Sequence, residues 1–369
     1  MKKTIFAIAT LSGTIIGVGV FSLPYITLKS GFWTILIYFL ILAPAVSLIH
    51  IFLAKLSLKT PDFKRLPGFA KIYLGERGKK ITLIVTVLGL SGTLLAYLIV
   101  GGEFLKEFLS PIFGGTNLIY TLFYFSLGSI LIFFGIKSIS KIELVSLFLF
   151  FGILILIFIK SFPIISSKNL FLKSSFSTLD FFSPYGVVLF SFWALNIIPE
   201  IEEMLSGQKE KIFKVILFSM LICAIFYLFF IYTILGISGQ NTTKNSLSGL
   251  KNIVGHNILN LAFLIGFLTT FTSYITLGLT LKKIFWYDLK LPKNLSFLIT
   301  CFPPLFLYFA GIKNFISVIS FVGSVMMGIN GITVCLMYRK IHPKNFLVYP
   351  LILVLGGGII WEIIYHFLK

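Results

Sequence analysis

Three glycines and a proline interrupt the first apolar segment of the chain. Gly13, Gly17, Gly19 and Pro24 fall within twelve residues of each other. In the interior of a helix, glycine costs about 1 kcal/mol and proline about 3 kcal/mol relative to alanine. The pattern therefore predicts a break near Gly17-Val18-Gly19. The backbone N–H and C=O groups freed there could bind a carboxylate, an ammonium group or a cation. Gly13 and Gly17 also form a small-xxx-small pair, which suits a tight helix–helix contact instead.

A second apolar segment, at residues 184–204, is interrupted near its middle by Asn196 and Pro199. A proline pushes the residue before it out of the α-helical region and suits the first turn of a new helix. Glu200 follows at once, where the positive end of a helix favours an acidic side chain. We therefore expect two half-helices joined within residues 194–198.

The elements that position these breaks are membrane helices. The 369 residues are 57% hydrophobic and 12% charged, with a mean hydropathy of +1.02, whereas a soluble domain carries about 25% charged residues. Continuous apolar runs favour helices over the alternating strands of a barrel. About 20 apolar residues cross the hydrocarbon core as a helix. Eleven runs approach that length, near residues 4–27, 32–56, 81–102, 118–136, 143–163, 184–204, 212–237, 255–281, 295–310, 314–338 and 346–367.

The two breaks lie in runs one and six, which are five runs apart. Interrupted helices at matching positions of two halves indicate an inverted repeat with a binding site near its midplane. Unwound backbone at membrane depth is tolerated only where it is buried in protein or lines a cavity. We expect one integral membrane domain over residues 1–369, with repeats at about 4–163 and 184–338 and an extra helix at 346–367.

The basic residues predict the orientation of the chain. With the N-terminus in the cytoplasm, 22 of the 31 lysines and arginines fall on the cytoplasmic side and 9 on the other, as the positive-inside rule requires. An odd number of spans then places the C-terminus outside. Because topology accounts for the net charge of +19, we expect the lipid bilayer and no nucleic acid as a partner.

The segment Gly13-Thr-Ile-Ile-Gly-Val-Gly-Val-Phe-Ser-Leu-Pro-Tyr25 resembles the first-helix signature of permeases in the amino acid–polyamine–organocation superfamily. Residues 190–200 and 315–324 are most similar to the amino acid/auxin permease branch, which includes bacterial aromatic amino-acid permeases. The resemblance covers nearly the whole chain. It implies an all-α, five-plus-five inverted-repeat transporter fold of about eleven membrane helices, with helices 1 and 6 broken. It also implies a substrate held between helices 1, 3, 6, 8 and 10.

Two groups of residues correspond to the substrate site that the resemblance implies. The backbone of the first break would meet the carboxylate of an amino acid, and the second break would line its ammonium and side-chain end. The first group is Thr14, Gly17, Val18 and Gly19. The second group is Phe192, Trp193, Ala194 and Asn196. Its two aromatic members could serve packing alone, since they are among 61 aromatic residues, most of which we expect to face lipid.

The resemblance also implies a possible sodium site. Sodium-coupled members of the fold bind Na⁺ between the first break and hydroxyl groups of run eight. Thr272 and Ser273 match that hydroxyl pair, with Gly13 on the first helix. Serine and threonine in membrane helices also bond to their own backbone, so these hydroxyls could be structural.

Proton coupling is the other option. Proton-coupled relatives can carry a lysine midway along run five, but Lys160 lies at the outer end of that run here. Ionisable residues at membrane depth are functional candidates by default. Glu200 and Glu103 are therefore the candidates for coupling or gating.

We expect a secondary active transporter that moves an amino acid across the cytoplasmic membrane by Na⁺ or H⁺ symport, with no other cofactor and no catalytic or metal site. A non-transporting amino-acid sensor of the same fold is an alternative. A channel is disfavoured because no filter sequence is visible. An enzyme is disfavoured because HExxH and GxSxG motifs are absent from the sequence. The four histidines, His50, His256, His342 and His366, lie near predicted span ends.

Overall fold

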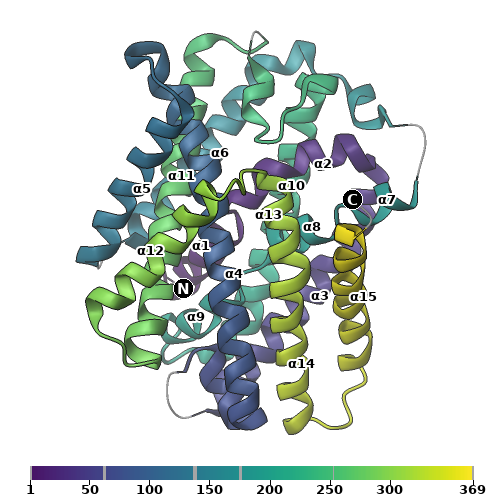
Figure 1. Ribbon diagram of the computed structural model, residues 1–369. Helices are drawn as coiled ribbons and strands as arrows, with labels where there is room; N and C mark the ends of the chain where they lie inside the picture. The colour runs from purple at the N-terminus through teal and green to yellow at the C-terminus, as the bar shows by residue number, and fades with distance from the viewer. Residues whose placement is uncertain (1, 61–63, 136–138, 174–176, 252, 368–369) are drawn as a thin grey trace.

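The computed structural model describes residues 2–60, 64–135, 139–173, 177–251 and 253–367, and every regular element in these ranges is a helix (Figure 1). Nine of the described helices are long and apolar enough to cross a membrane, or ten if the bent N-terminal pair counts as one span. Each of the eleven predicted runs overlaps a helix or a helix pair. The predicted ninth run corresponds to α12 (Lys293–Phe309), which has 17 residues.

The first half of the chain contains six helices and a short 3₁₀ segment. These are α1 (Lys2–Ile15), η1 (Val18–Ser22), α2 (Leu23–Ser30), α3 (Phe32–Lys59), α4 (Leu66–Phe113), α5 (Asn117–Phe134) and α6 (Ile139–Ser161). Short elements follow before the second half, namely η2 (Phe162–Ile164), η3 (Ser167–Phe171) and α7 (Thr178–Phe182).

The second half begins with another broken helix. It contains α8 (Tyr185–Phe192), η4 (Leu195–Ile197), α9 (Ile198–Met204), η5 (Lys209–Lys211), α10 (Ile212–Ser238), η6 (Gly239–Asn241), η7 (Leu247–Leu250), α11 (His256–Lys283), η8 (Ile284–Asp288) and α12. It ends with α13 (Phe315–Phe321), η9 (Val322–Met327), α14 (Gly328–Ile341) and the extra helix α15 (Val348–Phe367).

Both predicted breaks are confirmed. α1 ends at Ile15, Gly17 is extended (φ −97°, ψ −154°), and the chain bends by 44° before α2. In the second half, Trp193 is extended (φ −85°, ψ 122°) between α8 and η4. Pro199 lies in the first turn of α9, where its missing N–H costs no helical hydrogen bond.

Two elements differ from the sequence-based expectation. Residues 66–80, which lie between the predicted runs 32–56 and 81–102, are helical, because α4 begins at Leu66 and turns at Gly75, whose φ of +75° suits glycine. The run predicted at 314–338 contains a π-helical segment, η9. A Cβ at Gly323 of η9 would collide with the carbonyl oxygen of Gly186 in α8. The two glycines therefore let the backbones of spans six and ten touch.

The helices stand side by side and expose two opposite ends of the bundle. We call the basic end the one at which α3 ends, α4 begins and α14 ends; it lies at the bottom of Figure 1. Lys55, Lys59, Arg339 and Lys340 mark it. α14 and α15 lie beside each other on one flank of the bundle, while α5 and α12 lie on the other.

Candidate functional site

A cavity of about 300 Å³ lies between the two broken helices. α4, α11 and η9 complete its wall, so it is formed by spans 1, 3, 6, 8 and 10. Pockets of about this size and upwards hold small ligands. Six of the residues predicted for the substrate site line the cavity, namely Thr14, Gly17, Gly19, Trp193, Ala194 and Asn196.

Tyr97 of α4 covers the first break. Its hydroxyl accepts a hydrogen bond of 3.2 Å from the backbone N–H of Val18. A Cβ at Gly17 would collide with the same hydroxyl oxygen. The glycine is therefore needed for Tyr97 to approach the unwound backbone. Sequence reasoning identified Gly17 and Val18 but missed Tyr97, although the resemblance implied that span three lines the site.

Val18 and Phe192 are placed differently from the other predicted residues. The side chain of Val18 is buried, and its backbone N–H is what points at Tyr97. Phe192 packs against Phe39 of α3, with ring centroids 5.0 Å apart. Phe190 lines the cavity instead. Side chains two positions apart on a helix point in different directions, which explains why Phe190 and not Phe192 lines the cavity.

His50 of α3 supports the second break. Its Nε2 accepts a hydrogen bond of 3.3 Å from the backbone N–H of Ala194, and its ring lies edge-on to Trp193 with centroids 6.1 Å apart. The side chain is completely buried, although the sequence suggested a histidine near a span end. Because Nε2 is the acceptor, the proton of the neutral ring is on Nδ1. The imidazole thus fixes two consecutive residues that line the cavity.

Replacing His50 by leucine is expected to lower uptake at low substrate concentration by about tenfold, because the buried N–H of Ala194 then loses its acceptor. His50→Gln, which can present an amide oxygen, should remain within about threefold of the wild type. The measurement is initial uptake corrected for protein in the membrane. Ser47→Ala is the matched control, since the Ser47 hydroxyl bonds only within α3, to the Ala43 carbonyl, among the described residues. Equal losses in the leucine and glutamine variants would contradict the role of the acceptor.

Of the three residues predicted for an ion site, one lines the cavity and two lie outside its lining. Ser273 lines the cavity, while Thr272 and Gly13 are buried and fall outside the lining of described residues. The Thr272 hydroxyl donates to the carbonyl of Thr269, 3.1 Å away, and the Thr276 hydroxyl donates to the carbonyl of Thr272 at the same distance. The hydroxyl pair is thus buried beside the cavity, with Thr272 bonded within its own helix.

The two acidic candidates lie at different ends of the bundle. Glu200 lines the cavity where it reaches the exposed Lys283 at the basic end. Its Oε2 is buried and has no hydrogen-bond partner in the described part of the chain. Glu103 accepts a hydrogen bond of 2.9 Å from Asn245 and lines a separate pocket at the opposite end. Only Glu200 of this pair can therefore face a ligand in the cavity.

An aromatic cluster closes the cavity toward the opposite end. Phe21 of η1 packs against Phe104 of α4, with centroids 4.7 Å apart, and against Phe150 and Phe230 at 5.3 and 6.0 Å. All four side chains are essentially inaccessible to solvent. The cavity therefore opens toward the basic end and is closed at the opposite end, where Phe21 follows the first break.

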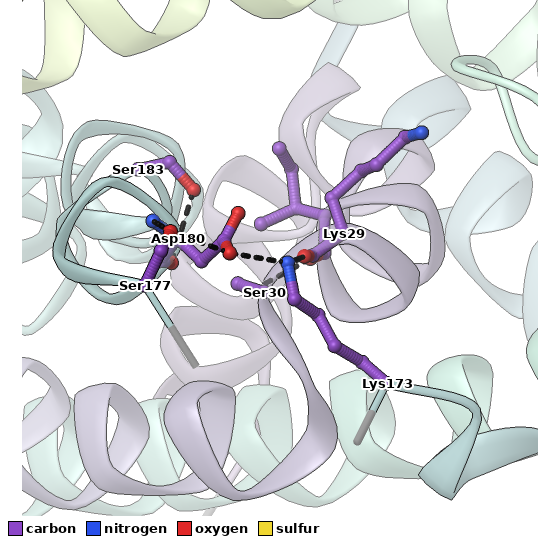
Figure 2. A network of polar contacts seen from close by, with 7 residues as sticks. Lys29, Ser30, Lys173, Ser177, Asp180 and Ser183 are labelled. Carbon is purple, nitrogen blue, oxygen red and sulfur yellow. Dashed lines mark hydrogen bonds and ion pairs between the residues drawn. The ribbon is translucent and has the colours of Figure 1, made fainter. Parts of the chain in front are cut away.

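A polar network at the end opposite the basic end connects α2 with α7 (Figure 2). Lys173 donates to the carbonyl of Lys29, near the end of α2, and pairs with Asp180 of α7 at 2.6 Å. Ser177 caps α7 by accepting from the N–H of Asp180. Since α7 leads directly into α8, the network fastens the end of span one to the start of span six.

The sequence matches the model of the Tryptophan/tyrosine permease family over residues 1–368. The chain belongs to the tryptophan/tyrosine permease family. Among curated proteins, it is 25% identical over 344 residues to the "Tyrosine-specific transport system 1" of Haemophilus influenzae, covering 88% of this chain and 85% of the relative. It is 22% identical over 245 residues to the "Glutamine transporter 2" of Aliivibrio fischeri, covering 66% and 62% of the two chains.

Two solved structures share the fold. The chain superposes on MhsT in complex with L-phenylalanine with a TM-score of 0.73, covering 98% of this permease and 97% of that chain at 13% identity. It superposes on the inward-facing conformation of Mhp1 with a TM-score of 0.69, covering 98% and 89% at 13% identity. The permease thus has the five-plus-five inverted-repeat transporter fold. Membership of the permease family, together with the apolar helices, makes it a multi-pass secondary amino-acid transporter and not an enzyme.

Proposed function

We propose that this permease carries an aromatic amino acid, tyrosine or tryptophan, across the cytoplasmic membrane together with Na⁺. The observation that carries the proposal is the shared cavity, in which unwound backbone from both broken helices faces Tyr97 and Trp193. The named specificity of the tyrosine relative and the family description support an aromatic substrate. The sequence motifs favour the amino acid/auxin permease branch within the wider superfamily.

The two breaks offer complementary charges to an amino acid. η1 and α2 begin at the first break, and helix N-termini favour anions. The substrate carboxylate would therefore bind beside Gly17 and Gly19, where it competes with or joins the Tyr97 hydroxyl at the N–H of Val18. The carbonyl of Ala194 and the side chain of Asn196 would receive the ammonium group. An aromatic side chain would then lie against apolar lining residues, namely Phe190, Trp193, Leu90 and Met327.

The cavity supports an inward-open state in the proposed orientation. The positive-inside rule puts the basic end, and with it the N-terminus, in the cytoplasm, and the C-terminus would be outside. The cavity reaches the basic end beside Glu200 and Lys283, while the cluster around Phe21 seals the other end. Alternating access would require that the two repeats, at about residues 4–163 and 184–338, rock about this site.

Sodium is the coupling ion that we favour over a proton. Hydroxyl and carbonyl oxygens are available on α11 around Thr272 and Ser273, beside the first break. In transporters with broken helices, unwound carbonyls and half-helix ends coordinate the coupling ion. Proton coupling through Glu200 is the second candidate, because its carboxylate faces the cavity with a buried oxygen that has no partner in the described residues.

Uptake into proteoliposomes tests the proposal. Purified protein would be supplied with labelled tyrosine, tryptophan, phenylalanine, glutamine and alanine, under imposed sodium and proton gradients in separate experiments. We expect saturable uptake of the aromatic amino acids and acceleration by unlabelled substrate inside the vesicle. Binding without flux would indicate the amino-acid sensor instead, and unitary currents would indicate a channel. Uptake restricted to glutamine would contradict the aromatic assignment.

A further inference from the structure

Tyr227 of α10 contacts both broken helices at their C-terminal ends. Its hydroxyl lies 2.7 Å from the carbonyl oxygen of Ile15, the last residue of α1. The same hydroxyl lies 2.6 Å from the carbonyl oxygen of Ser191, in the last turn of α8. The side chain is completely buried. One side chain of span seven thus bridges the two interruptions that form the cavity.

The Tyr227 hydroxyl lies where the negative ends of two helix dipoles come close together. The last carbonyls of a helix have no partner within it and carry the negative end of the helix dipole. Here two such ends, α1 and α8, converge on one point inside the protein, where a buried acceptor without enough donors is costly. The Ile15 carbonyl already accepts the N–H of Gly17 at 2.8 Å, which leaves one lone pair of Ile15 and the Ser191 carbonyl facing each other. Something positive must lie between them. In transporters with discontinuous helices, half-helix ends of this kind coordinate a cation.

The phenolic hydrogen of Tyr227 supplies a partial positive charge at this point. A tyrosine hydroxyl has one proton to donate, so the two carbonyls share it. The ring is held by Phe192 and Phe39, with centroids 5.2 and 6.2 Å away. These ring contacts therefore hold the Tyr227 hydroxyl in place without a bound ion.

Further donors on α10 follow the same face of the helix. Ser219 donates to the carbonyl of Ile8 at 3.2 Å, and Cys223 donates to the carbonyl of Ser12 at 3.7 Å. Residues 219, 223 and 227 are spaced by four and share one side of a helix. α10 thus follows α1 along three successive turns, and Tyr227 ends this row at the break.

We infer that Tyr227 is a positioning residue whose hydroxyl takes the place of a cation between the ends of α1 and α8. It keeps the two breaks in register whether or not an ion is present. A coupling ion would then bind elsewhere, for example beside Thr272 and Ser273. The inference rests on the proposed function where uptake is measured, so its decisive experiment uses the protein without substrate.

Removing the hydroxyl of Tyr227 while keeping its ring tests the donor by itself. Tyr227→Phe keeps the ring and removes the donor. It should lower uptake at low substrate concentration by at least about tenfold, because the buried Ser191 carbonyl loses its donor and the Ile15 carbonyl keeps only the N–H of Gly17 among the described residues. Tyr232→Phe on the same helix is the matched control and should transport like the wild type. Normal uptake by Tyr227→Phe would overturn the inference.

The decisive measurement is thermal unfolding of purified protein with and without salt. Tyr227→Asn leaves room beside the two carbonyls and adds an amide oxygen, so it should acquire a cation site there. We expect NaCl or LiCl, compared with choline chloride at equal ionic strength, to raise the unfolding temperature of Tyr227→Asn clearly more than that of the wild type. Tyr227→Ser should behave in the same way. A cation response in both variants no larger than that of the wild type would overturn the cation-equivalent role. Failure of wild-type uptake would instead count against the proposed function alone.

Discussion

Replacing Gly19 by leucine is expected to abolish uptake, with a loss of more than about 100-fold, because displacing a binding site by about 1 Å costs this much. A Cβ at Gly19 would lie 2.6 Å from the hydroxyl oxygen and 3.0 Å from the Cα of Ser191, and 3.1 Å from the ring of Phe190. These atoms belong to α8, so any side chain at this position pushes the first break away from the second. The measurement is initial uptake of labelled tyrosine or tryptophan by the purified variant in proteoliposomes.

The control for this prediction is Gly152, an exposed glycine of α6. A Cβ at this position would meet no atom of the described residues within 4 Å. Gly152→Leu should therefore insert and transport like the wild type. Gly19→Ala should fall between the wild type and Gly19→Leu, since its single carbon is tolerated with a smaller shift. All three variants must elute as monodisperse species from a sizing column. Wild-type uptake by a well-folded Gly19→Leu protein would disprove the proposed site.

Replacing sodium by choline is expected to lower uptake by the wild type by at least about tenfold, because linked ligands commonly favour each other by 1–3 kcal/mol, which is 5- to 150-fold in affinity. The proposed oxygen ligands lie around Thr272 and Ser273, both buried in α11. The double variant Thr272→Ala and Ser273→Ala should therefore need much more sodium for half-maximal uptake. The measurement is initial uptake as a function of sodium concentration at fixed pH.

A neighbouring hydroxyl provides the comparison for the sodium experiment. Thr270 is also buried in α11, and its hydroxyl bonds to the carbonyls of Gly266 and Phe267 in the same helix. Thr270→Ala should leave the sodium dependence unchanged. Equal uptake in sodium and choline would exclude sodium coupling, and a proton gradient combined with Glu200→Gln would then be the next test. A loss caused by Glu200→Gln under a proton gradient would identify that carboxyl group as the coupling site.

The sequence by itself determined where the chain crosses the membrane and where two of its helices break. Composition decides the first, because only a bilayer accommodates long apolar runs with so few charges. Local backbone energetics decide the second. Gly17, Gly19 and Pro199 weaken a helix wherever they occur, so their effect can be predicted without knowing any neighbour.

The tertiary structure alone decided which side chains meet at the breaks. Tyr97, His50 and Tyr227 come from three different helices, and each bonds to backbone at or next to a break, many residues away in the chain. Their positions depend on the rotation and depth of packed helices, which no local pattern specifies. The same reason explains why Phe192 packs away from the cavity while Phe190 lines it. Membrane helices are apolar on nearly every face, so hydrophobic periodicity cannot show which face turns inward. Packing against neighbouring helices sets that rotation.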